Sequence, residues 1–324
     1  MSKRLGGFPW AIAFFLFALL SSCIGQAQKT IDVRENKNAI LVQDYDWPGA
    51  DTIIWSPVSD HILVNSVSRN DNYSLIYLID LEKNTSATIF QTSPGDGVVQ
   101  ADDWSPDGKE IILNVIGGGT LYEKGLWIAP IGGLASMTYL TPGQDSSWSS
   151  NGNVAFRDDD LATPNRALLL YYIDGKYVDG IYDPENRQIA FPSWAPDNSE
   201  IVFSMCDVEA EDPKEDLFVL EIETGNIRQI TTSGNNTMQD WSPLGGLIAY
   251  IHIDTSESIP IFNLSISDPN GDCTFTIRGL KDPWSPTWSP DSRRIAFISE
   301  QNVYVIDLSK IFGNNFPESG IPCE

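Results

Sequence analysis

A tryptophan recurs six times in this chain at nearly constant spacing, and this repeat limits the fold more than any other feature. The spacings are 49, 44, 46, 47 and 47 residues, between Trp55, Trp104, Trp148, Trp194, Trp241 and Trp288. Each Trp begins a variant of the phrase Trp-Ser-Pro-Asp-Gly, and five of the six copies have Pro two places after the Trp. Ser, Pro and Gly at the first, second and fourth places suit a type I β-turn, so a turn should follow each Trp.

The residues after each turn alternate as β-strands do. Two apolar residues follow on one strand face, as Ile111 and Leu113 do after Trp104. A second strand has an aromatic marker such as Tyr77, and a third is visible in most copies, as at residues 88–92. About four short strands in ~45 residues, repeated six times, predict an all-β, six-bladed β-propeller. One blade cannot bury its own apolar face, so each repeated Trp should pack between neighbouring blades.

The last repeat ends without a final strand. No strand pattern follows in residues 309–324, whereas residues 38–43, before the first repeat, are strand-like. We therefore expect an N-terminal strand over residues 38–43 to complete the last blade and remove an exposed sheet edge. The predicted propeller covers residues 38–312, and residues 313–324 form a C-terminal tail.

The repeated phrase resembles the TolB-type WD-like β-propeller repeat. The sixth copy carries it most fully, with Ile-Ala-Phe at 295–297 and Val-Tyr-Val-Ile-Asp at 303–307. The resemblance covers roughly residues 38–308 and implies a propeller, but no single function, because this repeat serves very different proteins. TolB also has an α/β domain ahead of its propeller. Fewer than 20 residues separate Cys23 from the first candidate strand, so the resemblance is to the propeller alone.

Residues 1–22 have the pattern of a lipoprotein signal peptide. Lys3 and Arg4 precede an apolar run over residues 8–20, which is shorter than the ~20 residues that a membrane-spanning helix needs. The sequence Leu-Ser-Ser-Cys at 20–23 resembles the bacterial lipobox, which implies that Cys23 becomes the first mature residue and carries acyl chains. An ordinary secretory signal with an incidental Cys is the alternative. Residues 23–37 are polar and are predicted to be a tether, so we expect a lipid-anchored protein of the cell envelope that faces the periplasm or the extracellular space.

The charge argues against two classes of partner. The chain has 44 acidic and 20 basic side chains, a formal net charge of −24. A nucleic acid recruits Lys and Arg, and so does an anionic lipid surface, so we expect membrane attachment through the lipid anchor only. His61 and His252 occupy non-equivalent places in the repeat and do not make a metal-binding cluster.

Acidic loops are the candidate binding residues. By strand order they fall on one face of the ring, and their residues are Asp71, Asp158, Asp159, Asp160, Glu209, Glu211 and Asp254. A ligand there should be basic, neutral and polar, or a divalent cation. Ca²⁺ would suit oxygen ligands, but the spacing matches no EF-hand loop and no cofactor is predicted. A solvated acidic rim that keeps the protein soluble is the alternative.

Three cysteines remain besides Cys23. Cys273 and Cys323 fall on the same face and are a candidate disulfide that would pin the tail, since an oxidising envelope permits one. The alternative is that all three are reduced or buried. Cys206 opens on the opposite face and is expected to stay free.

These features favour a non-catalytic, lipid-anchored binding or scaffold module for an envelope protein or a polar ligand. The alternative is an envelope carbohydrate-active enzyme, a hydrolase or lyase with carboxylates in the central pocket. Two carboxyl groups facing each other there, about 5–10 Å apart, would favour the enzyme, and scattered carboxylates on the rim would favour binding.

Overall fold

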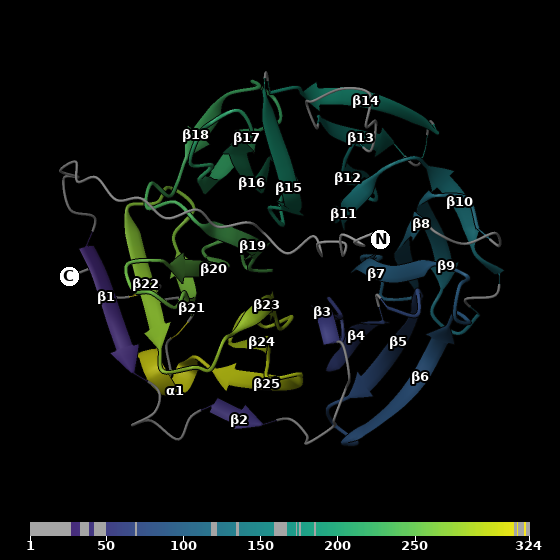
Figure 1. Cartoon of the computed structure of the whole chain (residues 1–324), viewed down its shortest axis with the longest axis horizontal. Coiled ribbons are helices and arrows are strands. Elements are labelled where there is room, and N and C mark those ends of the chain that lie inside the picture. The colour runs from purple at the N-terminus through teal and green to yellow at the C-terminus, as the bar shows by residue number, and fades with distance from the viewer. Residues whose placement is uncertain are drawn as a thin grey trace, which may run out of the picture.

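The computed structural model describes residues 27–32, 39–41, 50–68, 70–117, 122–133, 136–158, 167–172, 174, 176–184, 186–313, 316 and 321. Six sheets stand around a central axis, and each is one blade of a propeller, as Figure 1 shows. The prediction of an all-β, six-bladed propeller is confirmed. No helix within these ranges is long and apolar enough to cross a membrane.

Each of the first five blades has four consecutive antiparallel strands, from the innermost to the outermost. Blade 1 has β3 (Ala50–Trp55), β4 (His61–Ser68), β5 (Tyr73–Asp80) and β6 (Thr85–Gln91). Blade 2 has β7 (Val98–Trp104), β8 (Glu110–Gly117), β9 (Gly125–Pro130) and β10 (Thr138–Thr141). Blade 3 has β11 (Gln144–Trp148), β12 (Val154–Arg157), β13 (Leu168–Tyr172) and β14 (Tyr177–Tyr182). Blade 4 has β15 (Arg187–Trp194), β16 (Glu200–Asp207), β17 (Glu215–Glu221) and β18 (Ile227–Gln229). Blade 5 has β19 (Asn236–Trp241), β20 (Ile248–Asp254), β21 (Ile261–Ser267) and β22 (Cys273–Arg278).

Blade 6 contains β23 (Trp284–Trp288), β24 (Arg294–Ser299) and β25 (Asn302–Asp307). The backbone of β2 (Ala39–Leu41) runs antiparallel to β25, with Ile40 opposite Val305. Residues 38, 42 and 43 lie outside the described ranges, and the closing role of this segment stays a prediction. A further strand, β1 (Ala27–Asp32), runs parallel to β22 within the segment predicted as a tether.

A tight turn follows the Trp of each innermost strand. In blade 2 the Gly108 N–H donates to the Ser105 carbonyl at 2.8 Å, and Gly108 has a φ of +69°, which glycine tolerates well. The same bond joins the equivalent residues of blades 3 to 6, for example Gly245 to Ser242. The predicted turn is therefore present, and it directs the chain from the axis back into the blade.

The repeated Trp packs against the preceding blade, as predicted. Trp104 lies in one cluster with Leu63 and Ile76 of blade 1. Trp241 lies with Val202 and Leu217 of blade 4, and the other four copies follow the same rule. The core is thus a ring of inter-blade layers.

The chain after blade 6 packs back onto blade 5. Helix α1 (Ser309–Phe312) brings the Phe312 ring to 4.7 Å from the ring of Phe275 on β22, and Phe316 and Ile321 are buried in the same cluster. Cys273 on β22 is disulfide-bonded and Cys206 is a free thiol. Cys323 lies outside the described residues, so the Cys273–Cys323 pairing stays a prediction.

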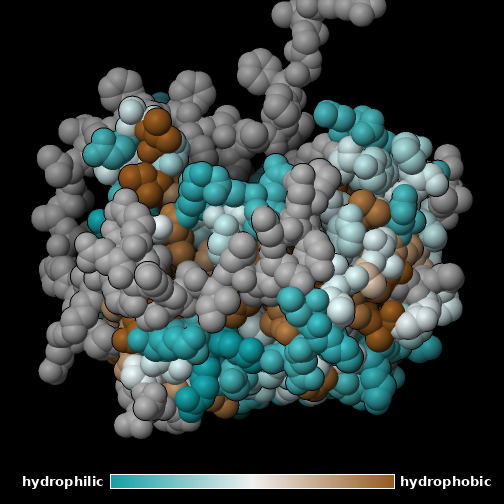
Figure 2. Space-filling model, turned by 90° about the horizontal axis from the view of Figure 1, so that it is seen from below, coloured by the Kyte–Doolittle hydropathy of each residue, from teal (hydrophilic) through white to brown (hydrophobic). Residues whose placement is uncertain are grey.

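Seen edge-on, the ring has hydrophilic residues along its lower edge and again at its upper edge, with hydrophobic patches on its side (Figure 2).

Candidate functional site: the central pocket

The six innermost strands line two pockets along the propeller axis. The central pocket, of about 360 Å³, is lined by residues that come before the Trp of each strand. The tryptophan mouth, of about 290 Å³, is lined by the Trp residues and the turns after them. Asp103, Ser147 and Asp240 belong to both linings, so the residue before the Trp forms the waist between the two pockets.

Every innermost strand is irregular where it lines the central pocket. Its pairing with the second strand shifts register shortly before the Trp in all six blades. In four consecutive blades, the residue three places before the Trp has a left-handed φ between +49° and +55°, namely Asp145, Phe191, Met238 and Ser285. A non-glycine residue pays for this conformation, and bulges commonly re-aim side chains at functional sites. The bulge therefore gives each of these blades a side chain in the pocket wall.

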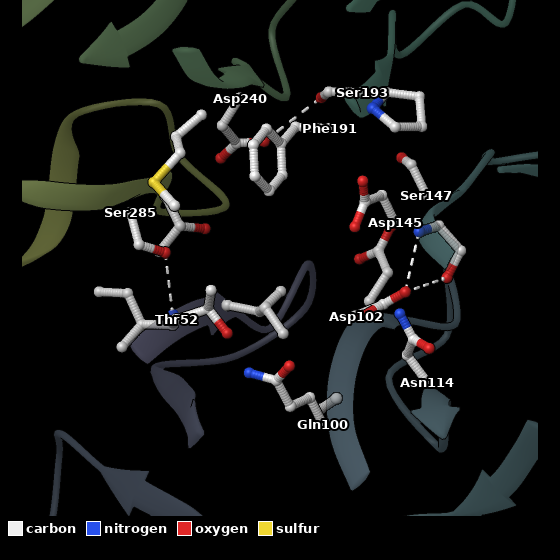
Figure 3. A pocket seen from close by; sticks show the side chains of 18 of the residues that line it. Thr52, Gln100, Asp102, Asn114, Asp145, Ser147, Phe191, Ser193, Asp240 and Ser285 are labelled. Atoms are coloured by element: carbon white, nitrogen blue, oxygen red, sulfur yellow. Dashed lines mark hydrogen bonds between the residues drawn. The ribbon is translucent and has the colours of Figure 1, made fainter. Parts of the chain in front are cut away.

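The wall from blades 2 and 3 is acidic. Asp102 Oδ2 accepts hydrogen bonds from the Ser146 N–H and Oγ, both at 2.9 Å, and Asp145 pairs with Arg157 Nε at 2.9 Å. Figure 3 shows Asp102 and Asp145 on the same side of the pocket. Burial, and then the charge of Asp145, raises the pKa of Asp102 to about 7.

Blade 1 contributes a third acid to the pocket. Gln100 Nε2 on β7 donates to Asp51 Oδ2 at 2.8 Å. This bond links the polar wall of blade 2 to the neighbouring innermost strand.

Two more carboxylates lie at the waist. Asp103 Oδ2 accepts from the Trp148 N–H at 2.6 Å, and Asp240 Oδ2 accepts from the Trp288 N–H at 2.7 Å. Each bond joins one blade to the next. Burial raises the pKa of Asp103 to about 7 and that of Asp240 to about 6.

The opposite wall places bulky apolar residues among polar ones, which include Gln239 and Asp240. Blades 4 to 6 contribute Phe191, Met238 and Trp284, and Phe191 projects into the view of Figure 3 across from Asp145. The pocket thus has one acidic wall and one wall with bulky apolar side chains, here called the apolar wall, and no Lys or Arg is among its lining residues in the described chain.

The acidic loop residues predicted from the sequence share a face with this pocket but do not line it. Gln144 at the start of β11 pairs with Arg157 at the end of β12, so the loops after the second strands lie at the pocket end of the ring. Asp71, Asp158, Glu209, Glu211 and Asp254 belong to such loops or to the strand ends beside them, and none is a lining residue. Asp159 and Asp160 lie outside the described residues. The binding role of this group stays a prediction.

Neither histidine reaches the pocket. His61 Nδ1 lies 2.7 Å from Ser59 Oγ, and His252 Nδ1 lies 3.0 Å from Asn236 Oδ1. Among the described residues, no group of three or more His, Cys, Asp or Glu side chains is arranged to hold a metal ion.

The pocket carboxylates are the site residues that the sequence reasoning missed. A signal was present, because Asp103 and Asp240 stand directly before a repeated Trp and Asp102 stands two places before one. Strand alternation could not reveal that the bulge aims these residues at the axis, since a bulge changes the side-chain phase locally.

Comparisons with known proteins bear on the fold alone. No protein-family model matches the sequence, and no curated protein matches it. The structure is similar to TolB from Acinetobacter baumannii (TM-score 0.55, 16% identity, 72% of this chain and 59% of that chain). It is also similar to a putative TolB from Agrobacterium tumefaciens (TM-score 0.59, 21% identity, 75% of this chain and 87% of that chain). A third similar structure is XC5397 from Xanthomonas campestris, described as a gluconolactonase (TM-score 0.59, 10% identity, 83% of this chain and 89% of that chain). This chain therefore spans less than two thirds of the A. baumannii TolB, and the shared propeller occurs in proteins of different function.

Proposed function

We propose that this chain is a lipid-anchored binding protein of the bacterial cell envelope, which holds a polar ligand or a segment of a partner in the central pocket. The observation that carries the proposal is the pocket itself, with three acidic side chains, Asp51, Asp102 and Asp145, at one end of a rigid ring. A cavity of about 360 Å³ admits a small ligand or a protruding side chain but not a folded domain.

The acidic loops around the pocket suit the same task. Charged loops at the mouth of a cleft steer an oppositely charged partner toward it. The lipobox-like residues 20–23 would hold the ring at a membrane surface, and residues 38–43 would close it as the last outer strand.

Site-specific photocrosslinking tests the binding role. A photoreactive residue at Gln100, which lines the pocket, should give adducts of defined mass in the living cell. The same residue at Asp107, in the turn beside the tryptophan mouth, is the control and should give none of them. Equal adducts at both positions, or none at Gln100, would contradict the proposal.

Catalysis is the second candidate, because two carboxyl groups of unlike surroundings share one wall. Asp102 has a pKa raised to about 7, whereas Asp145 is paired with Arg157. In enzymes that cleave glycosides, two carboxyl groups in different surroundings act as the general acid and the base or nucleophile. Incubation with envelope polysaccharide tests this candidate. New reducing ends that vanish in Asp102→Asn and persist in Asp107→Asn would establish the enzyme in place of the binding protein.

A further inference from the structure

The two walls of the central pocket differ in polarity, and two lining residues hold buried acceptor oxygens without hydrogen-bond partners. We propose that it takes a cationic group carried on an apolar stem, such as the ammonium group of a lysine side chain from a partner polypeptide. This inference rests on the proposed binding function and specifies the chemistry of its ligand.

The first step is the hydrogen-bond balance of the acidic wall. Both hydrogen bonds to Asp102 end on Oδ2, which leaves Oδ1 for a ligand. Asn114 lies opposite Gln100 in the strand pairing, is 3% exposed, and its Oδ1 has no hydrogen-bond partner. On the opposite wall, Gln239 of blade 5, which is 5% exposed, likewise has an unpartnered Oε1.

With Asp102 ionised, these three oxygens are all acceptors, so the ligand must supply donors. A buried polar atom without a partner is destabilising, and a bound donor removes that penalty. An ammonium group has three donors and no acceptor, which matches the imbalance.

The second step is charge. Among the lining residues of the described chain there is no basic side chain. Arg157 approaches from β12 and is engaged by Asp145 and by Gln144, whose Oε1 accepts from Nη2 at 2.9 Å. No hydrogen bond or ion pair joins a cation of the described residues to Asp102. A carboxylate in these surroundings favours a cationic ligand over a neutral one.

The third step is the apolar wall. Phe191 and Met238 are held in the pocket by the left-handed bulges of blades 4 and 5, and Trp284 completes the wall. An aliphatic stem would bury its methylene groups there, while aromatic faces also attract a nearby cation. A fully hydrated inorganic ion would gain nothing from this wall.

Binding of n-hexylammonium, 1-hexanol and hexanoate to the full propeller, measured by titration calorimetry, tests the inference. The ammonium should bind at least about tenfold more tightly than the alcohol, and hexanoate should not bind, because a charge-assisted hydrogen bond is worth about 1.5–3 kcal/mol. Equal affinities for the ammonium and the alcohol would overturn the cationic part. Binding of the ammonium without binding of the alcohol, and without loss in Phe191→Ala, would overturn the apolar part.

Variants locate the effect. Asp102→Asn should weaken hexylammonium binding by about tenfold or more and leave the alcohol unchanged, whereas Asp107→Asn, in an exposed turn at the other end, should change neither. Unchanged ammonium binding in Asp102→Asn would refute the assignment. If Asp102→Asn does not fold, Asn114→Leu removes one acceptor at nearly constant volume and should selectively weaken the ammonium. Adducts at Gln100 together with failure of hexylammonium to bind would refute the cationic ligand and leave the binding function standing.

Discussion

At the residue scale, the side chain directly before the Trp joins one blade to the next in four of the repeats. Thr287 Oγ1 accepts from the Trp55 N–H at 3.1 Å, and Ser193 Oγ accepts from the Trp241 N–H at 3.0 Å. Asp103 and Asp240 make the equivalent bonds with a carboxylate. A hydroxyl group is enough to accept the hydrogen bond that joins two blades. The carboxylates of Asp103 and Asp240 make the same bond, but burying an ionised carboxylate carries a larger desolvation penalty.

The indole nitrogens divide the repeated Trp residues into distinct types. Trp241 Nε1 donates to the Gly245 carbonyl of its own turn at 3.0 Å, whereas Trp194 Nε1 is buried without a partner. Both rings are almost fully buried between blades. Trp194→Ala should therefore lower the free energy of unfolding by about 3–5 kcal/mol through the cavity it leaves.

Replacement by Phe separates packing from hydrogen bonding. Trp241→Phe should cost about 1 kcal/mol more than Trp194→Phe, because only the former loses a hydrogen bond. Urea unfolding of the four proteins, wild type included, measures both effects. A Trp194→Ala variant as stable as the wild type would refute the packing role of the ring.

The waist carboxylates make stability depend on pH. The pKa of Asp240 is raised by burial from 3.8 to about 6, so the folded state holds its proton more tightly than the unfolded state. Stability should consequently fall as pH rises from about 4 to about 6, and Asp103, with a pKa raised to about 7, extends the fall to about pH 7. In the Asp240→Asn variant, stability should fall less between pH 4 and pH 6. The urea concentration at the midpoint of unfolding, measured at each pH, would show this.

Two groups define the controls for this measurement. The pKa of Asp107 is lowered to about 2, first by its hydrogen bond with Lys109, so Asp107→Asn should shift the curve without changing its slope above pH 4. Burial lowers the pKa of His252, so this residue makes stability rise with pH and opposes the effect of the two aspartates. Its contribution is the same in the wild type and in each variant, so it cancels when their stabilities are compared. An Asp240→Asn curve parallel to the wild type would contradict the assignment.

At the scale of the elements, the sequence was sufficient for the blades and insufficient for the site. Trp, Pro and Gly act locally, so the turn after Trp104 and the strand that contains Ile111 could be predicted from nearby residues. The left-handed residues Phe191 and Met238 carry no such signature, because neither is a residue type that favours that conformation. Their bulges depend on the surrounding ring, and the pocket walls depend on the bulges.

The element that would complete blade 6 can be tested by truncation. Removal of residues 24–43 should lower the unfolding midpoint, since β25 loses its outer neighbour and exposes a strand edge. Removal of residues 24–37 alone is the matched control and should leave the midpoint unchanged if that segment is only a tether. Equal destabilisation by both deletions would assign the effect to β1 and blade 5 instead, and no effect of either would contradict closure.

At the scale of the whole molecule, the two ends of the ring differ in chemistry. The acidic pocket and the acidic loops share one end, while the other end has the Trp residues, which are largely buried, and their turns. A lipid anchor at Cys23, as proposed, would let the pocket end face away from the bilayer, where a soluble partner or ligand is accessible. Whether the pocket works at a membrane surface therefore depends on the proposed lipid anchor.

Replacement of the anchor cysteine tests this arrangement. Cys23→Ser should move the protein from the membrane fraction to the soluble fraction after cell lysis, because a Ser at this position cannot carry the thioether-linked lipid of a lipoprotein. Cys206→Ser is the matched control, since Cys206 is a free thiol within the propeller and its loss should leave the protein with the membrane. Labelled fatty acid should be incorporated into the wild type and into Cys206→Ser, and not into Cys23→Ser. A Cys23→Ser protein that still sediments with membranes would show that the lipobox interpretation is wrong, and that any attachment comes from the apolar run over residues 8–20 or from a partner.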